Sequence, residues 1–333
     1  MRITPELLLK FANDYIAQRS KVDRDIIAVY LQGSLLRENQ LIGGTTDIDL
    51  FFLHAEEIRE NREFVRITDE IHIDISHQPV SLYRRPKELR SHPWLGPGIE
   101  GCKILYDPQH FLDFTQASVR GQFDRPDQVL NRVRPQVEHA REIWLSFQAE
   151  KPQGSPQDIL TYLRALEHAA NAIARLSGSP LTERRFLIDF PERAASVKHS
   201  GLYAGLLGLL GSPLVDASKL RSWLTDWQTA YDAAAQNHLI QRIHPVRLNY
   251  YLKAFESLLE GERFQVVLWP LWRTWTQIVD ALPTQTTVLP AWQAAGESLG
   301  MLNQAFHERL TALDAFLDLI DETLEIWSRE NGA

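Results

Sequence analysis

The sequence predicts an α+β protein, in which a small mixed β-sheet domain (residues 1–120) is followed by an all-α helical bundle domain (residues 125–333). Up to about residue 120, short β-branched apolar runs alternate with a helical pattern, whereas the later sequence is almost entirely helical in its spacing. The length of 333 residues also indicates two domains, at roughly 100 to 200 residues per domain.

Four apolar runs in the first part are predicted strands. They cover residues 26–31, 48–53, 71–75 and 103–106, and the first ends at Gly33-Ser34 and the last at Asp107-Pro108. A helix is expected before them, over residues 5–19, because apolar residues recur there at helical spacing after a proline in the first turn.

Six long helices are expected in the second part. They cover residues 127–147, 156–176, 220–237, 245–260, 264–282 and 290–327, with breaks at 151–155 and 177–180. Trp269, Trp272 and Trp275 recur every three residues, and a stripe of this kind is more often core than a binding surface. The alternative is an aromatic wall for a sugar or a cationic ligand.

Composition and charge exclude several classes of protein. No run approaches the roughly 20 apolar residues of a membrane span, and no basic region followed by an apolar one begins the chain. The single Cys102 cannot form an intramolecular disulfide, so we expect a cytoplasmic protein. The net charge of −8 argues against nucleic acid as a partner and favours a cationic or metal-bridged ligand.

Three acidic residues on the predicted strands indicate a metal site. Asp47 and Asp49 stand two apart at the head of one strand and therefore face the same side, and Asp74 lies within another strand. Their repulsion, on the order of 4 kcal/mol at about 4 Å, must be offset by a cation or by protonation. Hard oxygen ligands suit Mg²⁺, and three carboxylates would complete a two-metal site. Surface acids near a turn are the alternative for an isolated Asp-x-Asp.

The order of these residues resembles the DNA polymerase β-like nucleotidyltransferase superfamily. An apolar strand leads into Gly33-Ser34, twelve residues follow, and then come Asp47-Ile48-Asp49 and a third acid, Asp74, on a later strand. The resemblance covers roughly residues 20–110. Two positions depart from the family pattern without removing a metal ligand: Glu38 stands where many members have Gly, and Thr46 stands where Ser is usual.

The resemblance implies a role for each of these residues. Gly33 and Ser34, at the start of a helix, would bind the β- and γ-phosphates of ATP, and Arg37 in the same segment would join them in nucleotide binding. Asp47 and Asp49 would hold Mg²⁺. Asp74 would share a second Mg²⁺ or deprotonate the acceptor hydroxyl, and the reaction would be in-line attack on the α-phosphorus with release of pyrophosphate.

The helical part is expected to supply the acceptor site. Its arrangement resembles the kanamycin- and streptomycin-type antibiotic nucleotidyltransferases, in which a helical domain contributes a carboxylate as general base. Glu167 borders the apolar arc of its predicted helix and is the candidate; the alternative is that it pairs with Arg164 or another nearby cation. Arg184 and Arg185 could clamp the triphosphate, or they could form a solvated helix start.

The expected activity is therefore transfer of AMP from ATP to a hydroxyl of a small molecule, with a cationic, aminoglycoside-like acceptor as first choice. Two alternatives are AMP transfer to a protein or RNA end, as in toxin–antitoxin systems, and a non-catalytic nucleotide-binding module. A helical ribonuclease is a weaker interpretation, because the segment between Arg193 and His199 lacks the polar residue usual after the arginine.

Overall fold

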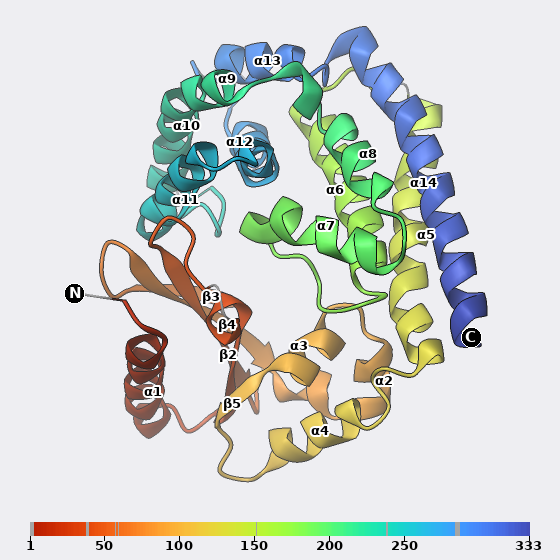
Figure 1. Cartoon of the computed structure of the whole chain (residues 1–333). Coiled ribbons are helices and arrows are strands. Elements are labelled where there is room, and N and C mark those ends of the chain that lie inside the picture. Colours follow the sequence, from red (N-terminus) through yellow and green to blue (C-terminus); the bar gives the residue numbers. More distant parts are fainter. Residues whose placement is uncertain are drawn as a thin grey trace. The chain divides into compact units, whose positions relative to one another are not determined.

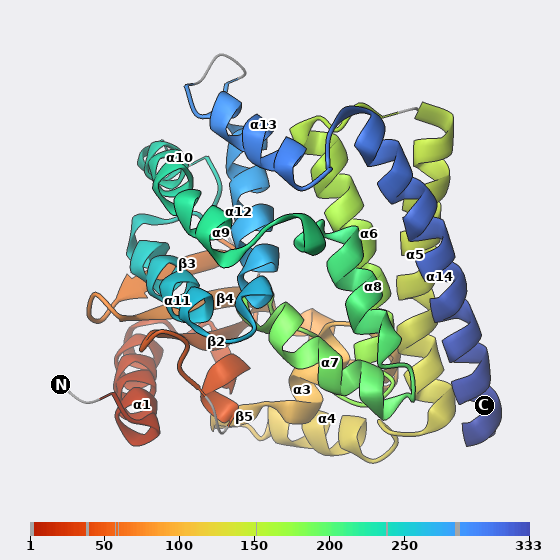
Figure 2. The same ribbon diagram turned by 45° about the horizontal axis from the view of Figure 1, so that its top comes forward.

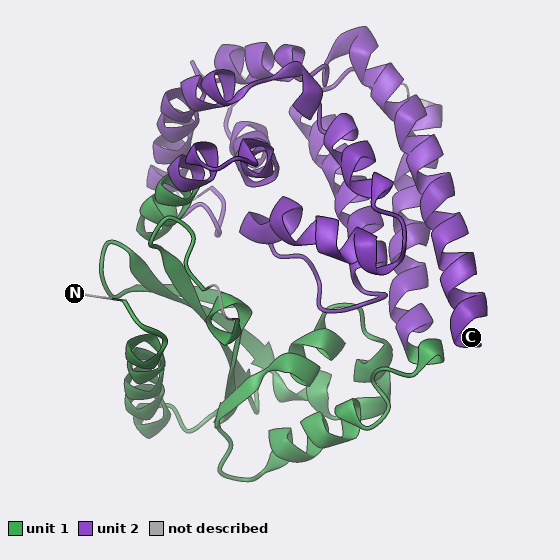
Figure 3. Ribbon diagram, viewed as in Figure 1, with its two compact units in different colours: residues 1–128, 246–254 green, residues 129–245, 255–333 purple. Residues whose placement is uncertain are grey.

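The fold is described from a computed structural model that covers residues 3–37, 40–56, 58, 60–150, 152–237, 239–283 and 287–333. Glu38, one of the two departures from the family pattern, lies outside these residues. The chain forms two compact units (Figure 3). The first contains residues 1–128 and 246–254, and the second contains residues 129–245 and 255–333.

The first unit is built on one mixed five-stranded sheet of order β3-β4-β2-β1-β5 (Figure 1). Its strands are β1 (Ile26–Gln32), β2 (Thr46–His54), β3 (Arg62–Arg66), β4 (Ile71–Pro79) and β5 (Lys103–Tyr106). The β2–β4 pair is parallel, whereas the other three pairs are antiparallel. A sheet unit followed by helices confirms the predicted α+β class.

Helices cover both faces of this sheet. Helix α1 (Pro5–Val22) begins at Thr4, whose hydroxyl accepts a hydrogen bond from the Leu7 backbone N–H at 3.3 Å. Its buried stripe packs on one face of the sheet in a shared core with Ile48 and Ile73. The opposite face packs on α2 (Pro86–Ser91), α3 (Leu95–Gly101) and α4 (Phe111–Arg120).

Strand β3 is the element of the sheet that the sequence pattern did not predict. Three of its five residues, Arg62, Glu63 and Arg66, are charged, so it carries no apolar run. It lies at the sheet edge and pairs antiparallel with β4 along its whole length. Charged side chains are common on edge strands, where one side of the backbone has no partner strand.

The second unit is helical. Its helices are α5 (Pro126–Glu150), α6 (Pro156–Ala174), α7 (Phe186–Ser196), α8 (Gly201–Leu209), α9 (Ala217–Ser222), α10 (Leu224–Gln236), α11 (Leu248–Glu260), α12 (Leu268–Ala281), α13 (Leu289–Ser298) and α14 (Asn303–Asn331), with the starts of α5 and α11 in the first unit. Figure 2 shows α12 among its neighbours in this unit, and it contacts α6, α7, α10 and α13. Trp269, Trp272 and Trp275 of α12 are fully buried, which confirms that the tryptophan stripe is core.

Three predictions for the helical part were wrong in detail. The expected single helix over residues 220–237 is divided into α9 and α10, with a turn at Trp223 between them. The expected single helix over residues 290–327 is two helices, because Gly300 adopts the left-handed conformation with φ of +64° and ends the first. Helices α7 and α8 were not expected, and glycines at 201, 205 and 208 weaken the helical signal of α8. Among the described residues, none of the helices is long and apolar enough to cross a membrane.

Candidate metal site

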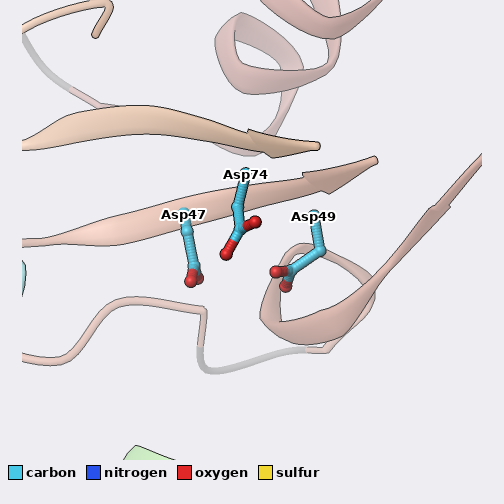
Figure 4. A group of neighbouring side chains, drawn as sticks. All are labelled: Asp47, Asp49 and Asp74. Atoms are coloured by element: carbon cyan, nitrogen blue, oxygen red, sulfur yellow. The ribbon is translucent and has the colours of Figure 1, made fainter. Parts of the chain in front are cut away.

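Strands β2 and β4 bring the three predicted carboxylates together. In their parallel pairing Asp49 lies directly opposite Asp74, and Asp47 stands two residues before Asp49 on the same face. One oxygen of each carboxylate lies within 4.8 Å of the others, and the three side chains converge in Figure 4. Asp47 and Asp74 are buried and Asp49 is partly buried. The predicted clustering of these acids is confirmed.

The sheet holds these carboxylates on a rigid base. Ile48, between the two aspartates of β2, points to the opposite face and is fully buried in the core beneath α1. Ile73 and Ile75, on either side of Asp74, do the same. The alternation of apolar and acidic residues thus determines which face of each strand points to the core. A shift of the strand register by one residue would bury the carboxylates in the apolar core.

The turn after β1 approaches the acidic cluster closely. Gly33 has a φ of +83°, and a Cβ atom on it would lie 1.9 Å from Asp49 Oδ2, so a residue with a side chain would displace that carboxylate. Ser34 Oγ and Thr46 Oγ1 are 2.9 Å apart, which ties the turn to the start of β2. The expected helix after this turn is a four-residue 3₁₀ helix, η1 (Gly33–Leu36).

Arg37 ends this 3₁₀ helix and is partly exposed. Its backbone N–H donates to the Ser34 carbonyl oxygen at 3.0 Å, and this hydrogen bond stabilises the turn. Binding of a nucleotide by its side chain stays a prediction.

Two arginines that the sequence analysis missed contact the acidic cluster. Arg62 of β3 donates from Nε and Nη2 to the two oxygens of Asp74, at 2.7 and 2.5 Å. Arg247 Nη2 lies 3.7 Å from Asp47 Oδ2. Both arginines come from segments whose packing is not visible in local sequence, namely an edge strand without an apolar run and residues far along the chain.

The electrostatics of this cluster favour a cation. Burial raises the pKa of the Asp49 carboxyl well above its ordinary value of 3.8, and the charges of Asp47 and Asp74 raise it further, against the lowering effect of Arg62 and Arg247. Two guanidinium groups therefore leave the Asp49 carboxylate incompletely compensated. A divalent ion or a proton would supply the missing positive charge.

The donor set fits Mg²⁺. All three side chains offer hard carboxylate oxygens, and no nitrogen or sulfur ligand belongs to this group of residues. Ligands on opposite sides of an octahedral Mg²⁺ are about 4.2 Å apart, which is compatible with oxygens that lie within 4.8 Å of one another. Which metal binds, and whether two ions bind, stay predictions.

The remaining predicted site residues lie in the second unit. Glu167 Oε1 accepts a hydrogen bond from Arg273 Nη1 at 2.8 Å, so the expected alternative of pairing with a nearby cation is realised, with Arg273 in place of Arg164. Arg184 and Arg185 form the 3₁₀ helix η3 with Glu183 and are buried, so the solvated helix start was the wrong alternative for them. A role of these three residues in catalysis or nucleotide binding stays a prediction.

Neither the comparison with protein-family models nor the search of curated proteins finds a match for this chain.

Proposed function

We propose that the first unit is a Mg²⁺-dependent nucleotidyltransferase domain that transfers AMP from ATP to a hydroxyl group of a small molecule. The observation that carries this proposal is the cluster of Asp47, Asp49 and Asp74 on paired strands, with Gly33 so close that only a hydrogen fits beside Asp49. The order of these residues along the chain, the length of the gap and the clustering of the three carboxylates support the proposal.

In this proposal each residue would have a role that suits its position. Asp47 and Asp49 would hold Mg²⁺ in the reacting complex, and Asp74, oriented through both oxygens by Arg62, would complete the carboxylate set. Bound Mg²⁺ would stabilise the negative charge that develops on the phosphate oxygens. The η1 turn with Gly33 and Ser34 would offer backbone N–H groups and a hydroxyl to the phosphates.

The acceptor is proposed to be cationic because the chain carries a net charge of −8. The tryptophans at 269, 272 and 275 do not support an aromatic acceptor wall, since all three are fully buried. The acceptor class therefore rests on charge alone.

The test is a thermal-shift titration of ATP, GTP, CTP and UTP, each with Mg²⁺ and with chelator. A nucleotide present at 100 times its dissociation constant stabilises the protein by about 2.7 kcal/mol. We expect ATP with Mg²⁺ to stabilise the wild type and to lose this effect in the double variant Asp47→Asn, Asp49→Asn. Pyrophosphate release with a panel of hydroxyl-bearing amines then identifies the acceptor.

The matched control is Asp69→Asn, which makes the same chemical change at an exposed carboxylate that pairs with Arg66 on the surface. This variant should respond to ATP and Mg²⁺ as the wild type does. If the double variant keeps the Mg²⁺-dependent shift, the carboxylate cluster does not bind the metal and the proposal fails. Metal-dependent ATP binding without pyrophosphate release on any acceptor would favour the non-catalytic module.

A further inference from the structure

Residues 246–254, which comprise the end of the 3₁₀ helix η5 (Pro245–Arg247) and the start of α11, pack within the first unit although they follow most of the helical part in sequence. Gly43 has a φ of +61°, and a Cβ atom there would lie 2.0 Å from the Lys253 carbonyl oxygen, so the backbones meet without room for a side chain. Thr45 Oγ1 also lies 3.4 Å from the Tyr250 carbonyl oxygen, as a donor to it. The loop before β2 therefore packs directly against residues 246–254.

This segment presents Arg247 to the acidic cluster. The Arg247 side chain is 4% exposed and its Nη2 lies 3.7 Å from Asp47 Oδ2. Its guanidinium carbon lies 5.4 Å from the ring centre of Phe64, 5.0 Å from that of Tyr250 and 5.2 Å from that of Tyr251. Three aromatic rings on one guanidinium restrict its movement and favour its charged form.

The contact with Asp47 does not use the hydrogen-bonding geometry of the guanidinium. At 3.7 Å the pair is an ionic attraction that is longer than a hydrogen bond, in contrast to the two short bonds between Arg62 and Asp74. A guanidinium forms its strongest contacts with phosphate and carboxylate groups through two parallel N–H donors. If a divalent ion compensated Asp47, a phosphate would be the better partner for Arg247.

We propose that Arg247 binds the outer phosphates of the nucleoside triphosphate, so that residues 246–254 complete the nucleotide site of the first unit. This inference rests on the proposed nucleotidyltransferase function. The competing interpretation is that Arg247 is only a counter-ion of Asp47. The two differ in measurable respects: loss of a phosphate-binding arginine weakens triphosphate binding more than AMP binding without weakening the binding of a divalent ion alone, whereas loss of a counter-ion changes the affinity for the ion itself.

The experiment measures dissociation constants of α,β-methylene-ATP and of AMP by isothermal titration calorimetry, each with Mg²⁺, for wild type, Arg247→Gln and Arg247→Lys. We expect Arg247→Gln to weaken triphosphate binding at least about tenfold, which is the lower end for a hydrogen bond to a charged group. AMP binding should change less than about threefold, because AMP lacks the outer phosphates. Arg247→Lys should fall between, since lysine keeps the charge and loses the paired donors.

The control Arg66→Gln removes an exposed positive charge from the same sheet at a residue that pairs with Asp69. It should bind both nucleotides like the wild type. Binding of Mn²⁺ alone, followed by electron paramagnetic resonance, reports separately on the carboxylates. It should stay unchanged or become tighter in Arg247→Gln, because a neighbouring positive charge is lost.

Each result is decisive. If Arg247→Gln weakens ATP-analogue and AMP binding equally, or changes only Mn²⁺ affinity, Arg247 is a counter-ion and the inference is overturned while the proposed function stands. If the wild type itself binds no triphosphate with Mg²⁺, the proposed function fails and this inference fails with it. Should Arg247→Gln not fold, as judged by circular dichroism, Arg247→Lys carries the same comparison.

Discussion

The substitution Asp49→Asn should stabilise the protein without metal and remove its response to Mg²⁺. In the metal-free protein the Asp49 carboxylate faces Asp47 and Asp74 with oxygens within 4.8 Å. Each pair of charges at that distance repels by about 3.5 kcal/mol at an effective dielectric near 20, and the two neighbouring arginines offset part of it. Asparagine has nearly the same volume and no charge, so we expect a net gain of about 1 to 3 kcal/mol in the free energy of unfolding.

This gain should depend on pH in a defined direction. Burial and the two neighbouring carboxylates raise the pKa of Asp49 above 3.8, so the folded protein binds a proton that the unfolded chain releases. The stability of the metal-free wild type therefore falls as pH rises from about 3.8 through the raised pKa, and Asp49→Asn should abolish that fall. The gain is largest at high pH.

Urea unfolding with chelator and with Mg²⁺, at several pH values, measures both effects. The variant should be more stable than the wild type with chelator and should show no Mg²⁺-dependent increase. The control Asp69→Asn, at an exposed surface pair, should change stability by less than about 0.5 kcal/mol in either condition. If Asp49→Asn lowers metal-free stability at neutral pH, the repulsion argument is refuted, because the carboxylate would then be a net stabilising group.

Two further predictions concern the turn after β1 and the histidines on the other face of the sheet. Gly33→Ala should lose about 1 to 2 kcal/mol from its left-handed backbone and also weaken the Mg²⁺ response by displacing Asp49, whereas Gly44→Ala, with a φ of +71° and open space around its Cβ position, should lose only the backbone contribution. Equal Mg²⁺ responses of the two variants in thermal shift would contradict the close approach. Burial and the His54 charge lower the pKa of His77, so its contribution to stability is present above the ordinary pKa of 6.5 and is lost as pH falls below it. Urea unfolding should show a smaller acid loss for His77→Asn than for the wild type, and identical pH profiles would refute that role.

Local sequence was enough to locate the acidic residues of the site. Because Ile48 alternates with Asp47 and Asp49, both carboxylates must lie on the same face of a strand. Asp74 alternates with isoleucines on its own strand in the same way. The parallel pairing that places Asp49 opposite Asp74 was not visible, because pairing between strands is set by the path of the whole chain. The length of the helix expected after Gly33 was not visible either, and the structure has a single 3₁₀ turn there.

Only the tertiary structure shows which positively charged residues contact the carboxylates. Arg62 lies on β3, which has too few apolar residues to be predicted as a strand from the sequence. This strand forms because β4 supplies hydrogen-bonding partners along its length. Arg247 reaches Asp47 because residues 246–254 pack on the loop that contains Gly43. Periodicity reports which face a side chain occupies within one element, whereas the neutralisation of buried charge depends on residues that meet across long sequence separations.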